Sequence, residues 1–243
     1  MPAIGKFRAQ PLLTEPGEYE GWRIPSEADM QLIRRSLNHA RKDRHAMELT
    51  ALHQHLRGLG SQEDVTDSDA ALMQGLLSDD VAGAVEFNPL VLANMKGLGL
   101  DGGGHGAEVR KTLDGRVLSA RQGRDGWFLA NLLHARKILT GEAGVEAGDA
   151  GIIAGKLSTA RGEGGGAISG ESIAEMHYLL KELGVRVRVT EEDKRAIRFS
   201  LDYAREHCDG WTAAAILHHL KETLPEPRQK EEPVMPELRR FRR

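Results

Sequence analysis

A segment of 35 residues recurs near the two ends of this sequence, and it limits the possible folds more than any other feature. Ser26–Gly60 and Thr190–Leu224 align without a gap at an offset of 190 − 26 = 164, and 11 of the 35 positions are identical. The identities fall at helical spacing. Internal repetition of this kind is typical of proteins that stack one supersecondary unit several times. The sequence therefore predicts a repeat architecture.

Three further copies of the pattern lie between these two. An acid is followed four and eight residues later by apolar residues after Asp29, Asp69 and Asp149. The third copy has Val109 in place of the acid, but it shares an Asp-Gly-Trp sequence with the last copy. The period is about 40 residues. The predicted copies span residues 26–60, 66–99, 106–141, 146–184 and 190–224.

Each copy predicts two short helices joined by a turn. Ser26, Thr66 and Thr190 each stand three residues before an acid. In such a capping box the hydroxyl accepts from a free N–H at the helix start, and the acid favours the positive helix end. Apolar residues then recur at helical spacing, as in Ile33 and Leu37, and give the first helix one apolar stripe.

The second helix of each copy follows a short turn and ends near a glycine. Gly60, Gly99 and Gly184 suit the left-handed position just beyond a helix. Neither helix alone buries much surface, but stacked hairpins share a continuous core. We expect Leu37, Leu157 and Leu201 to be equivalent buried positions in that core.

The predicted fold class is all-α, with about five helical hairpins that form either a solenoid or a compact helical array. The composition agrees, because aromatic residues make up only 5% of the chain and an aliphatic core suits helices. Sequence reasoning leaves the open and the closed arrangement as alternatives.

Two proline-rich segments, residues 1–25 and 225–243, flank the repeats and are expected to form extended arms. Both mix isolated apolar residues with charges, which suggests that they bind a partner. The candidate partner-binding residues of the arms are Phe7, Trp22, Leu238, Arg239, Arg240, Phe241, Arg242 and Arg243.

An arginine recurs at the end of the first helix in four copies: Arg41, Arg121, Arg161 and Arg205. One interpretation is a favourable interaction of each cation with the negative helix end. The other is a row of arginines along one edge that binds acidic protein or phosphate. These four are therefore also candidate partner-binding residues.

The ten histidines form no known metal or catalytic motif. His53 and His55 point to different helix faces, and the adjacent His218 and His219 are expected to diverge as well. His53 and His177 share one repeat position, and His55 and His219 share another. This recurrence favours a structural role, such as a hydrogen bond across the hairpin. The sequence predicts no catalytic, metal-binding or cofactor-binding residue.

Two other patterns have a structural and a functional interpretation. Trp127 and Trp211 each follow an Asp-Gly pair, and they serve either as anchors between hairpins or as stacking platforms for a ligand. Residues 97–102 fit the G-x-G-x-x-G motif, but a helical pattern rather than a strand precedes them, which favours a linker. The glycines at 164–166 are typical of a flexible turn that could contact a ligand.

Charge and cysteine content narrow the functional classes. The formal net charge of −3 provides no basic field for nucleic acid or anionic lipid. Cys208 is the only cysteine, so the chain forms no internal disulfide. The first residues lack a secretory signal and no run of about 18 apolar residues occurs, so we expect a cytoplasmic protein without a membrane span.

Together these features predict a non-enzymatic helical-repeat protein that mediates protein–protein interaction, as an accessory or scaffold subunit of a larger assembly. The alternative is a nucleic-acid-associated protein that uses the arginine row and the basic C-terminal tail. The third and weakest hypothesis is an enzyme or ligand carrier built in the groove of the repeats. No cofactor is predicted.

Overall fold

The chain folds into α-helices, as predicted. A computed structural model describes residues 24–61, 63–78, 84–102, 105–162 and 167–224, and within these ranges it contains ten α-helices and no strand. The helices are α1 (Glu27–Asp43), α2 (Ala46–Gly58), α3 (Asp67–Ser78), α4 (Ala84–Gly97), α5 (His105–Gly123), α6 (Gly126–Thr140), α7 (Asp149–Gly162), α8 (Ala167–Glu182), α9 (Glu191–Glu206) and α10 (Gly210–Thr223). Residues 1–23 and 225–243, where the extended arms were predicted, lie outside the described residues.

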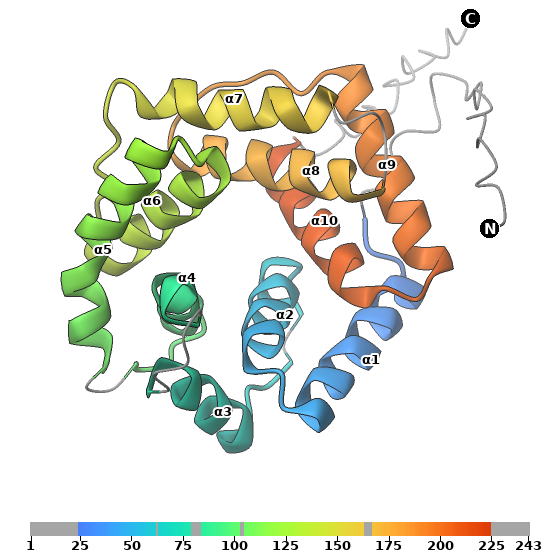
Figure 1. Cartoon of the computed structure of the whole chain (residues 1–243). Helices are drawn as coiled ribbons and strands as arrows, with labels where there is room; N and C mark the ends of the chain where they lie inside the picture. The colour runs from blue at the N-terminus through green and yellow to red at the C-terminus, as the bar shows by residue number, and fades with distance from the viewer. Residues whose placement is uncertain (1–23, 62, 79–83, 103–104, 163–166, 225–243) are drawn as a thin grey trace, which may run out of the picture.

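Consecutive helices pair into five hairpins that correspond to the five predicted copies. The hairpins close into a ring (Figure 1), with the odd-numbered helices on the outside and the even-numbered helices inside. The last helix, α10, packs against both α1 and α2 of the first hairpin. Of the two arrangements that the sequence left open, the structure therefore has the closed one.

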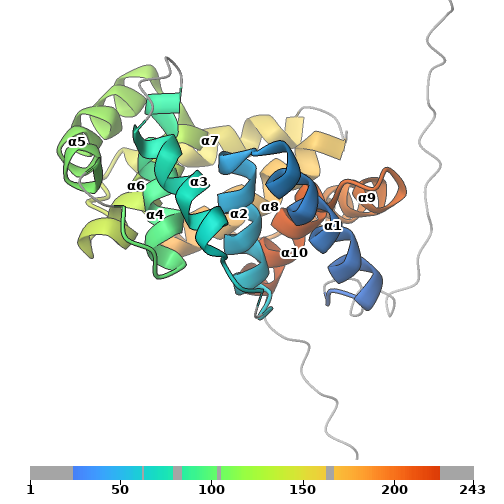
Figure 2. The same ribbon diagram turned by 90° about the horizontal axis from the view of Figure 1, so that it is seen from below.

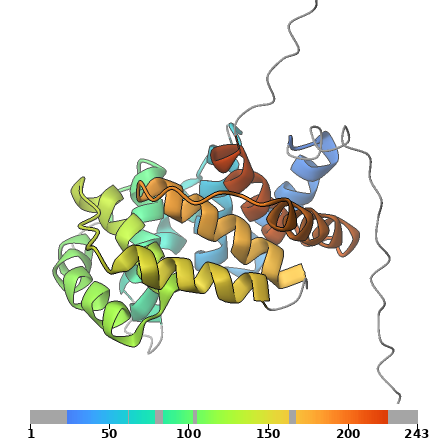
Figure 3. The same cartoon turned by 90° about the horizontal axis from the view of Figure 1, so that it is seen from above.

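Views along the other directions show how the two layers of the ring pack. From below, α1 and α3 lie beside α2 (Figure 2), and both contact it. From above, α7 lies along its hairpin partner α8 (Figure 3). Each inner helix is thus covered by outer helices, while its remaining face points to the centre of the ring.

The core lies between the two layers and consists of the predicted apolar stripes. Leu37, Leu157 and Leu201 are all buried, which confirms that they are equivalent positions. Burying one such side chain stabilises the fold by about 1.5–3 kcal/mol. Gly60, Gly99 and Gly184 have positive φ angles of 85°, 81° and 76°, as expected beyond a helix end.

Capping boxes fix where the outer helices begin. In α1, the Asp29 backbone N–H donates to the Ser26 hydroxyl, and the Ser26 N–H donates to the Asp29 carboxylate. Thr190 and Asp193 form the same reciprocal pair at α9. Thr66 and Asp69 form it at α3, so the predicted helix starts are confirmed at all three sites.

The capping acid also accepts a bidentate ion pair from the recurring arginine of the preceding hairpin. In each pair, the arginine Nε and Nη2 donate to the carboxylate at 2.7–3.1 Å. The pairs are Arg41–Asp69, Arg121–Asp149, Arg161–Asp193 and Arg205–Asp29. These contacts join neighbouring hairpins, and the last of them closes the ring.

The electrostatics of these joints follow from burial and pairing. Burial by itself raises the pKa of Asp69, but hydrogen bonds from Arg41 and from the Thr66 backbone outweigh it and lower the pKa to about 2. The same opposing causes leave the pKa of Asp29 below its usual range. These carboxylates are therefore ionised at neutral pH, and each has the cation that its burial requires.

The joint between the second and third hairpins is built differently. Its acid position, 69 + 40 = 109, holds the buried Val109. Its arginine position, 41 + 40 = 81, is Val81 in the sequence and lies outside the described residues. Both members of the ion pair are replaced together, so neither leaves an unpaired buried charge.

Two histidines strengthen the joints. His53 and His177, both buried, lie 3.1 and 3.0 Å from the carboxylates of Asp69 and Asp193. Their predicted structural role is confirmed, but the hydrogen bond runs to the next hairpin rather than across their own. Burial lowers the pKa of both histidines, although the nearby aspartates oppose the shift.

Three glycines let neighbouring hairpins approach closely. Gly126, Gly170 and Gly210 stand at equivalent positions near the starts of inner helices. A Cβ on Gly126 would lie 2.5 Å from the backbone oxygen of Ile152, and one on Gly210 would lie 2.6 Å from that of Leu32. A larger residue therefore has no room at these joints.

Candidate functional site

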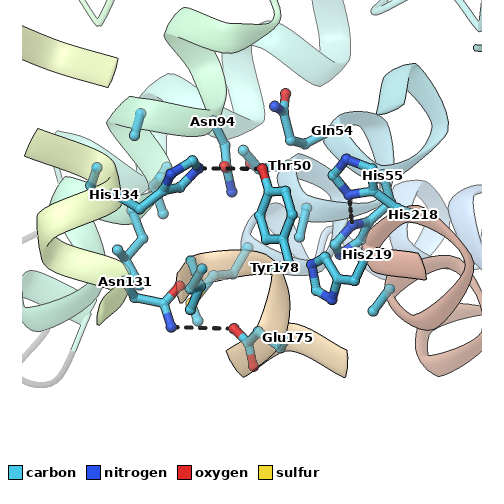
Figure 4. Close-up of a pocket in the computed structure, with 18 of the residues that line it drawn as sticks. Thr50, Gln54, His55, Asn94, Asn131, His134, Glu175, Tyr178, His218 and His219 are labelled. Carbon is cyan, nitrogen blue, oxygen red and sulfur yellow. Dashed lines mark hydrogen bonds between the residues drawn. The ribbon is translucent and has the colours of Figure 1, made fainter. Parts of the chain in front are cut away.

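A pocket of about 230 Å³ lies at the centre of the ring. All five inner helices contribute to its walls, and their polar side chains point into it (Figure 4). No other feature of the described residues combines enclosure, polarity and contributions from every copy, so we describe it as the candidate functional site.

The pocket walls are built mainly from three repeat positions on one face of each inner helix, and His55, Ala135, Leu179 and His219 line it from a fourth. Relative to the first copy, the later copies are offset by 40, 80, 124 and 164 residues. The first position holds Gln54, Asn94, His134, Tyr178 and His218. The second, three residues earlier, holds Ala51, Val91, Asn131, Glu175 and Ala215. The third, four residues earlier still, holds Met47, Trp127, Glu171 and Trp211.

These positions differ from the packing positions in one respect. The capping acid and the arginine each recur in four of the five copies and the apolar stripe stays apolar, whereas the pocket-lining residues vary more from copy to copy. The scaffold is therefore repeated, but the centre of the ring is chemically asymmetric. Seven helical residues separate the first and third positions, so their backbones stand about 10 Å apart along each helix. The side chains reach across this distance, since the Trp211 ring lies 6.1 Å from that of His55.

One end combines tryptophans with two carboxylates. The Trp127 indole N–H donates to Glu175 at 2.7 Å, and the Asn131 amide donates to the same carboxylate at 3.2 Å. Burial and the neighbouring Glu175 raise the pKa of Glu171 to about 7. Burial also raises the pKa of Glu175, despite these two hydrogen bonds. Among the described residues, no lysine or arginine forms an ion pair with either carboxylate.

The other end is a cluster of three histidines. His55 and His218 face each other through their Nδ1 atoms at 3.0 Å. With His219, they place three potential ligand atoms within 4.8 Å of one another. Tyr178 stacks on the His219 ring, with centroids 4.8 Å apart and planes 17° from parallel. Figure 4 shows all four side chains converging on the pocket.

Burial keeps these imidazoles neutral. It lowers the pKa of His55 to about 3, to which the neighbouring His218 adds, and that of His218 to about 4, to which Lys221 adds and which Glu182 opposes. Burial also lowers the pKa of His219 well below its usual value, and the adjacent histidines add to the effect. At neutral pH the three rings therefore keep nitrogen lone pairs available for a ligand.

Several pocket atoms are buried without a hydrogen-bond partner. They are Gln54 Oε1, His134 Nδ1 and His219 Nδ1. An unsatisfied buried polar atom costs about 1–3 kcal/mol, and these three atoms are available to pair with a ligand or with water in the pocket.

The structure corrects one prediction about these histidines. His218 and His219 were expected to diverge, but their rings lie 5.4 Å apart and both line the pocket. Adjacent helical residues differ by only about 100° in direction, and both rings bend toward the same cavity. His53 and His55 do point to different faces, the first to Asp69 and the second to the pocket. The repeat position that His55 and His219 share could have indicated that both rings face the same pocket.

The other candidate residues have diverse locations. Trp127 and Trp211 line the pocket, and Trp127 also bonds α8 through Glu175. Residues 97–102 follow helix α4 and not a strand, so the linker interpretation is confirmed.

The guanidinium groups of the four recurring arginines are engaged at the joints, and their predicted partner binding stays a prediction. The glycines at 164–166 and the arm residues, including Phe7, Trp22 and 238–243, lie outside the described residues.

None of the helices in the described ranges combines the length and the apolar character that a membrane span requires. No protein-family model matches the sequence. A comparison with curated proteins finds no match, and neither does a comparison with solved structures. The candidate site therefore has to be interpreted from its own geometry.

Proposed function

We propose that the protein binds a small cationic ligand, such as an organic amine, in the central pocket. The observation that carries the proposal is the order of side chains around one end of that pocket. Glu171 belongs to the hairpin between those of Trp127 and Trp211, and all three side chains line the same cavity. Two indoles and a carboxylate are the groups that recognise ammonium ions in proteins.

The charges at this end favour a cation. Glu171 and Glu175 lie four residues apart on α8, and each is buried enough that its ionised form is disfavoured. The ammonium group of a ligand would stabilise both ionised carboxylates. It would therefore offset the cost of burying them and their mutual repulsion. The tryptophans would add about 0.5–2 kcal/mol each through cation–π contacts.

The size of the pocket limits the ligand. A volume of about 230 Å³ lies below the roughly 300–1,000 Å³ of pockets that hold drug-sized ligands. This space suits a compact amine or quaternary ammonium ion.

The repeated scaffold and the asymmetric pocket also favour a ligand. A ring whose only role was structural would be stabilised best by an apolar centre, since buried polar atoms without partners are costly. Gln54 and His134 instead leave unpaired polar atoms in the pocket. A ligand that pairs with them would offset this cost.

Titration with tetramethylammonium, followed by calorimetry and by tryptophan fluorescence, tests the proposal. We expect saturable binding with one site per chain, and weaker binding of tert-butanol, which has a similar shape but no charge. Glu171→Gln should weaken tetramethylammonium binding at least about tenfold, which corresponds to about 1.4 kcal/mol. Glu182→Gln is the matched control, because Glu182 is also on α8 but pairs with Lys137 at 3.1 Å.

Two results would overturn the proposal. One is the absence of saturable binding by any member of a series from methylammonium to tetramethylammonium. The other is equal binding by the wild type and Glu171→Gln, because the carboxylate would then contribute nothing to recognition.

A second candidate is the protein-binding role predicted from the sequence. Phe199 and Tyr203 lie one turn apart on the outer helix α9 and are 53% and 44% exposed. An exposed aromatic pair of this kind is a possible contact for another protein. Purification from the native source should then lose a co-purifying chain in a Phe199→Ser/Tyr203→Ser variant. The nucleic-acid alternative rests on the arginine row and on the C-terminal arginines. Because the row is engaged at the joints, deleting residues 225–243 should abolish any such binding.

A further inference from the structure

We propose that His55, His218 and His219 form a binding site for one divalent transition-metal ion of the zinc class. The proposed ligands differ from the residues of the cationic-ligand proposal, although the two sites adjoin, since Trp211 lies beside His55 with ring centroids 6.1 Å apart. Imidazole nitrogens are common ligands of zinc, copper and nickel, and neutral rings are the form that binds.

The distances between the histidine nitrogens suit a single metal ion. Zinc binds histidine nitrogens at about 2.0–2.1 Å, so two ligands of a tetrahedral ion stand about 3.4 Å apart. His55 Nδ1 and His218 Nδ1 are 3.0 Å apart, and the whole cluster spans no more than 4.8 Å. Opening the close pair slightly and drawing His219 in by about 1 Å would complete a three-nitrogen site, a change within reach of side-chain rotation.

Two like atoms, the Nδ1 atoms of His55 and His218, also lie against each other. Without a metal, the contact between His55 Nδ1 and His218 Nδ1 requires a proton on one of them, because a neutral imidazole has one donor and one acceptor nitrogen. A bound cation would let both Nδ1 atoms use their lone pairs. Among the described residues, no carboxylate bonds to His55, His218 or His219, which differs from His53 and His177 with their aspartates.

Neighbouring residues hold the three histidine rings in place. His218 packs directly on Gly58, where any Cβ would overlap the Cδ2 and Nε2 side of its ring. This contact leaves the Nδ1 side turned toward His55. Tyr178 stacks on His219, whose own Nδ1 is buried without a partner. The rings are thus oriented before any ligand arrives, which lowers the cost of binding.

The coordination would be incomplete with protein ligands alone. Three histidines leave at least one position of a tetrahedral ion open, as in zinc sites that bind water or substrate. In this structure that position would face the pocket, since all three histidines line it. A water molecule or a donor atom of a small ligand would fill it.

Calorimetric titration of the untagged, EDTA-treated protein with Zn²⁺ tests the site directly. We expect one ion per chain, and at least about tenfold weaker binding in His55→Ala and in His219→Ala. The matched control is His39→Ala/His45→Ala, because these histidines are 66% and 58% exposed and lie outside the pocket. Unchanged binding in this control supports the site. Loss in the control but not in the pocket variants overturns it, as does the absence of Zn²⁺ binding by the wild type.

A measurement on the wild type covers the case in which a pocket variant fails to fold. Nuclear magnetic resonance of the ¹⁵N-labelled histidine rings reports which of the ten histidines bind the ion. We expect Zn²⁺ to shift the ring nitrogens of His55, His218 and His219 and to leave those of the other seven nearly unchanged. Shifts confined to other histidines would overturn the proposal.

Discussion

Arg205 on α9 donates two hydrogen bonds, of 2.7 and 2.8 Å, to Asp29 at the start of α1, although 176 residues separate them in the chain. The last hairpin is thereby joined to the first by the same bidentate pair that joins Arg121 to Asp149 within the chain. In energetic terms the closing joint should therefore be equivalent to an interior one.

This equivalence predicts that Arg205→Met and Arg121→Met cost a similar amount of stability. Either change leaves a buried aspartate without its cation, and we expect the free energy of unfolding to fall by about 2–3 kcal/mol. This is less than for a fully buried pair, because the Arg205 side chain is 29% exposed. Denaturation with urea measures both losses. Arg195→Met is the control, since Arg195 is also on α9 but 66% exposed, and it should change stability by less than about 0.5 kcal/mol. An Arg205 variant as stable as this control would mean that the ring is open in solution.

Acid should weaken the joints in a defined pH window. The folded pKa of Asp69 is about 2, below its ordinary value of 3.8, so its stabilising contribution is complete above about pH 4 and is lost as the pH falls through 2. The contribution corresponds to about 2 kcal/mol. The difference in unfolding free energy between the wild type and Asp69→Asn should therefore shrink between pH 5 and pH 2. Asp67→Asn, at the exposed start of α3, should keep the acid profile of the wild type. A difference that stays constant over this range would contradict the pairing with Arg41.

Glu171 should have the opposite pH dependence. Its folded pKa of about 7 lies above the ordinary 4.5, so its contribution is complete below pH 4.5 and is lost as the pH rises through 7. Glu171→Gln is neutral at every pH and should be more stable than the wild type at pH 8, by on the order of 3 kcal/mol, but nearly equal to it at pH 4. Thermal unfolding at the two pH values provides the measurement. The same stability difference at both would show that the carboxylate is not held in a desolvated site.

The close approach of α8 and α9 predicts opposite effects of one methyl group at two glycines. A Cβ on Gly170 would overlap the carbonyl oxygen of Ala196 in the backbone of α9, so Gly170→Ala should destabilise the protein by about 1–3 kcal/mol. Gly155, within α7, has nothing near the added atom, and Gly155→Ala should stabilise the helix by about 0.5–1 kcal/mol. Urea denaturation of both variants checks the sign of each change. Equal effects would mean that α8 and α9 are further apart than in the structure.

Local features of this fold were predictable from the sequence because they repeat at short range. The caps at Ser26 and Thr190 and the buried positions Leu37, Leu157 and Leu201 follow from helical spacing within single copies. Such signals depend on neighbours three or four residues away, which a sequence shows directly.

Closure of the ring was not predicted, because it depends on the small rotation that each hairpin adds to the last. The sequence did contain a signal for it. The recurring arginine and the recurring capping acid are both absent from the same joint, where Val81 and Val109 stand. Loss of both together indicates that they pair across hairpins.

The pocket was missed for a related reason. Its residues, such as Gln54, His134 and Tyr178, share a repeat position but not a residue type, so a search for similarity between copies passes over them. Only their common direction, toward the axis of a closed ring, brings them together. The contrast between constant and varied positions within one chain could have marked them in advance.

Closure also means that the number of hairpins determines the width of the centre and not the length of the molecule. A sixth hairpin added to an open stack would simply extend it by one unit. Here it would have to enter between two existing joints, push the inner helices apart and enlarge a cavity that is now about 230 Å³. Gain or loss of one 40-residue unit would therefore change the volume of the cavity in a single step. Point substitutions at the lining positions would change that volume only gradually.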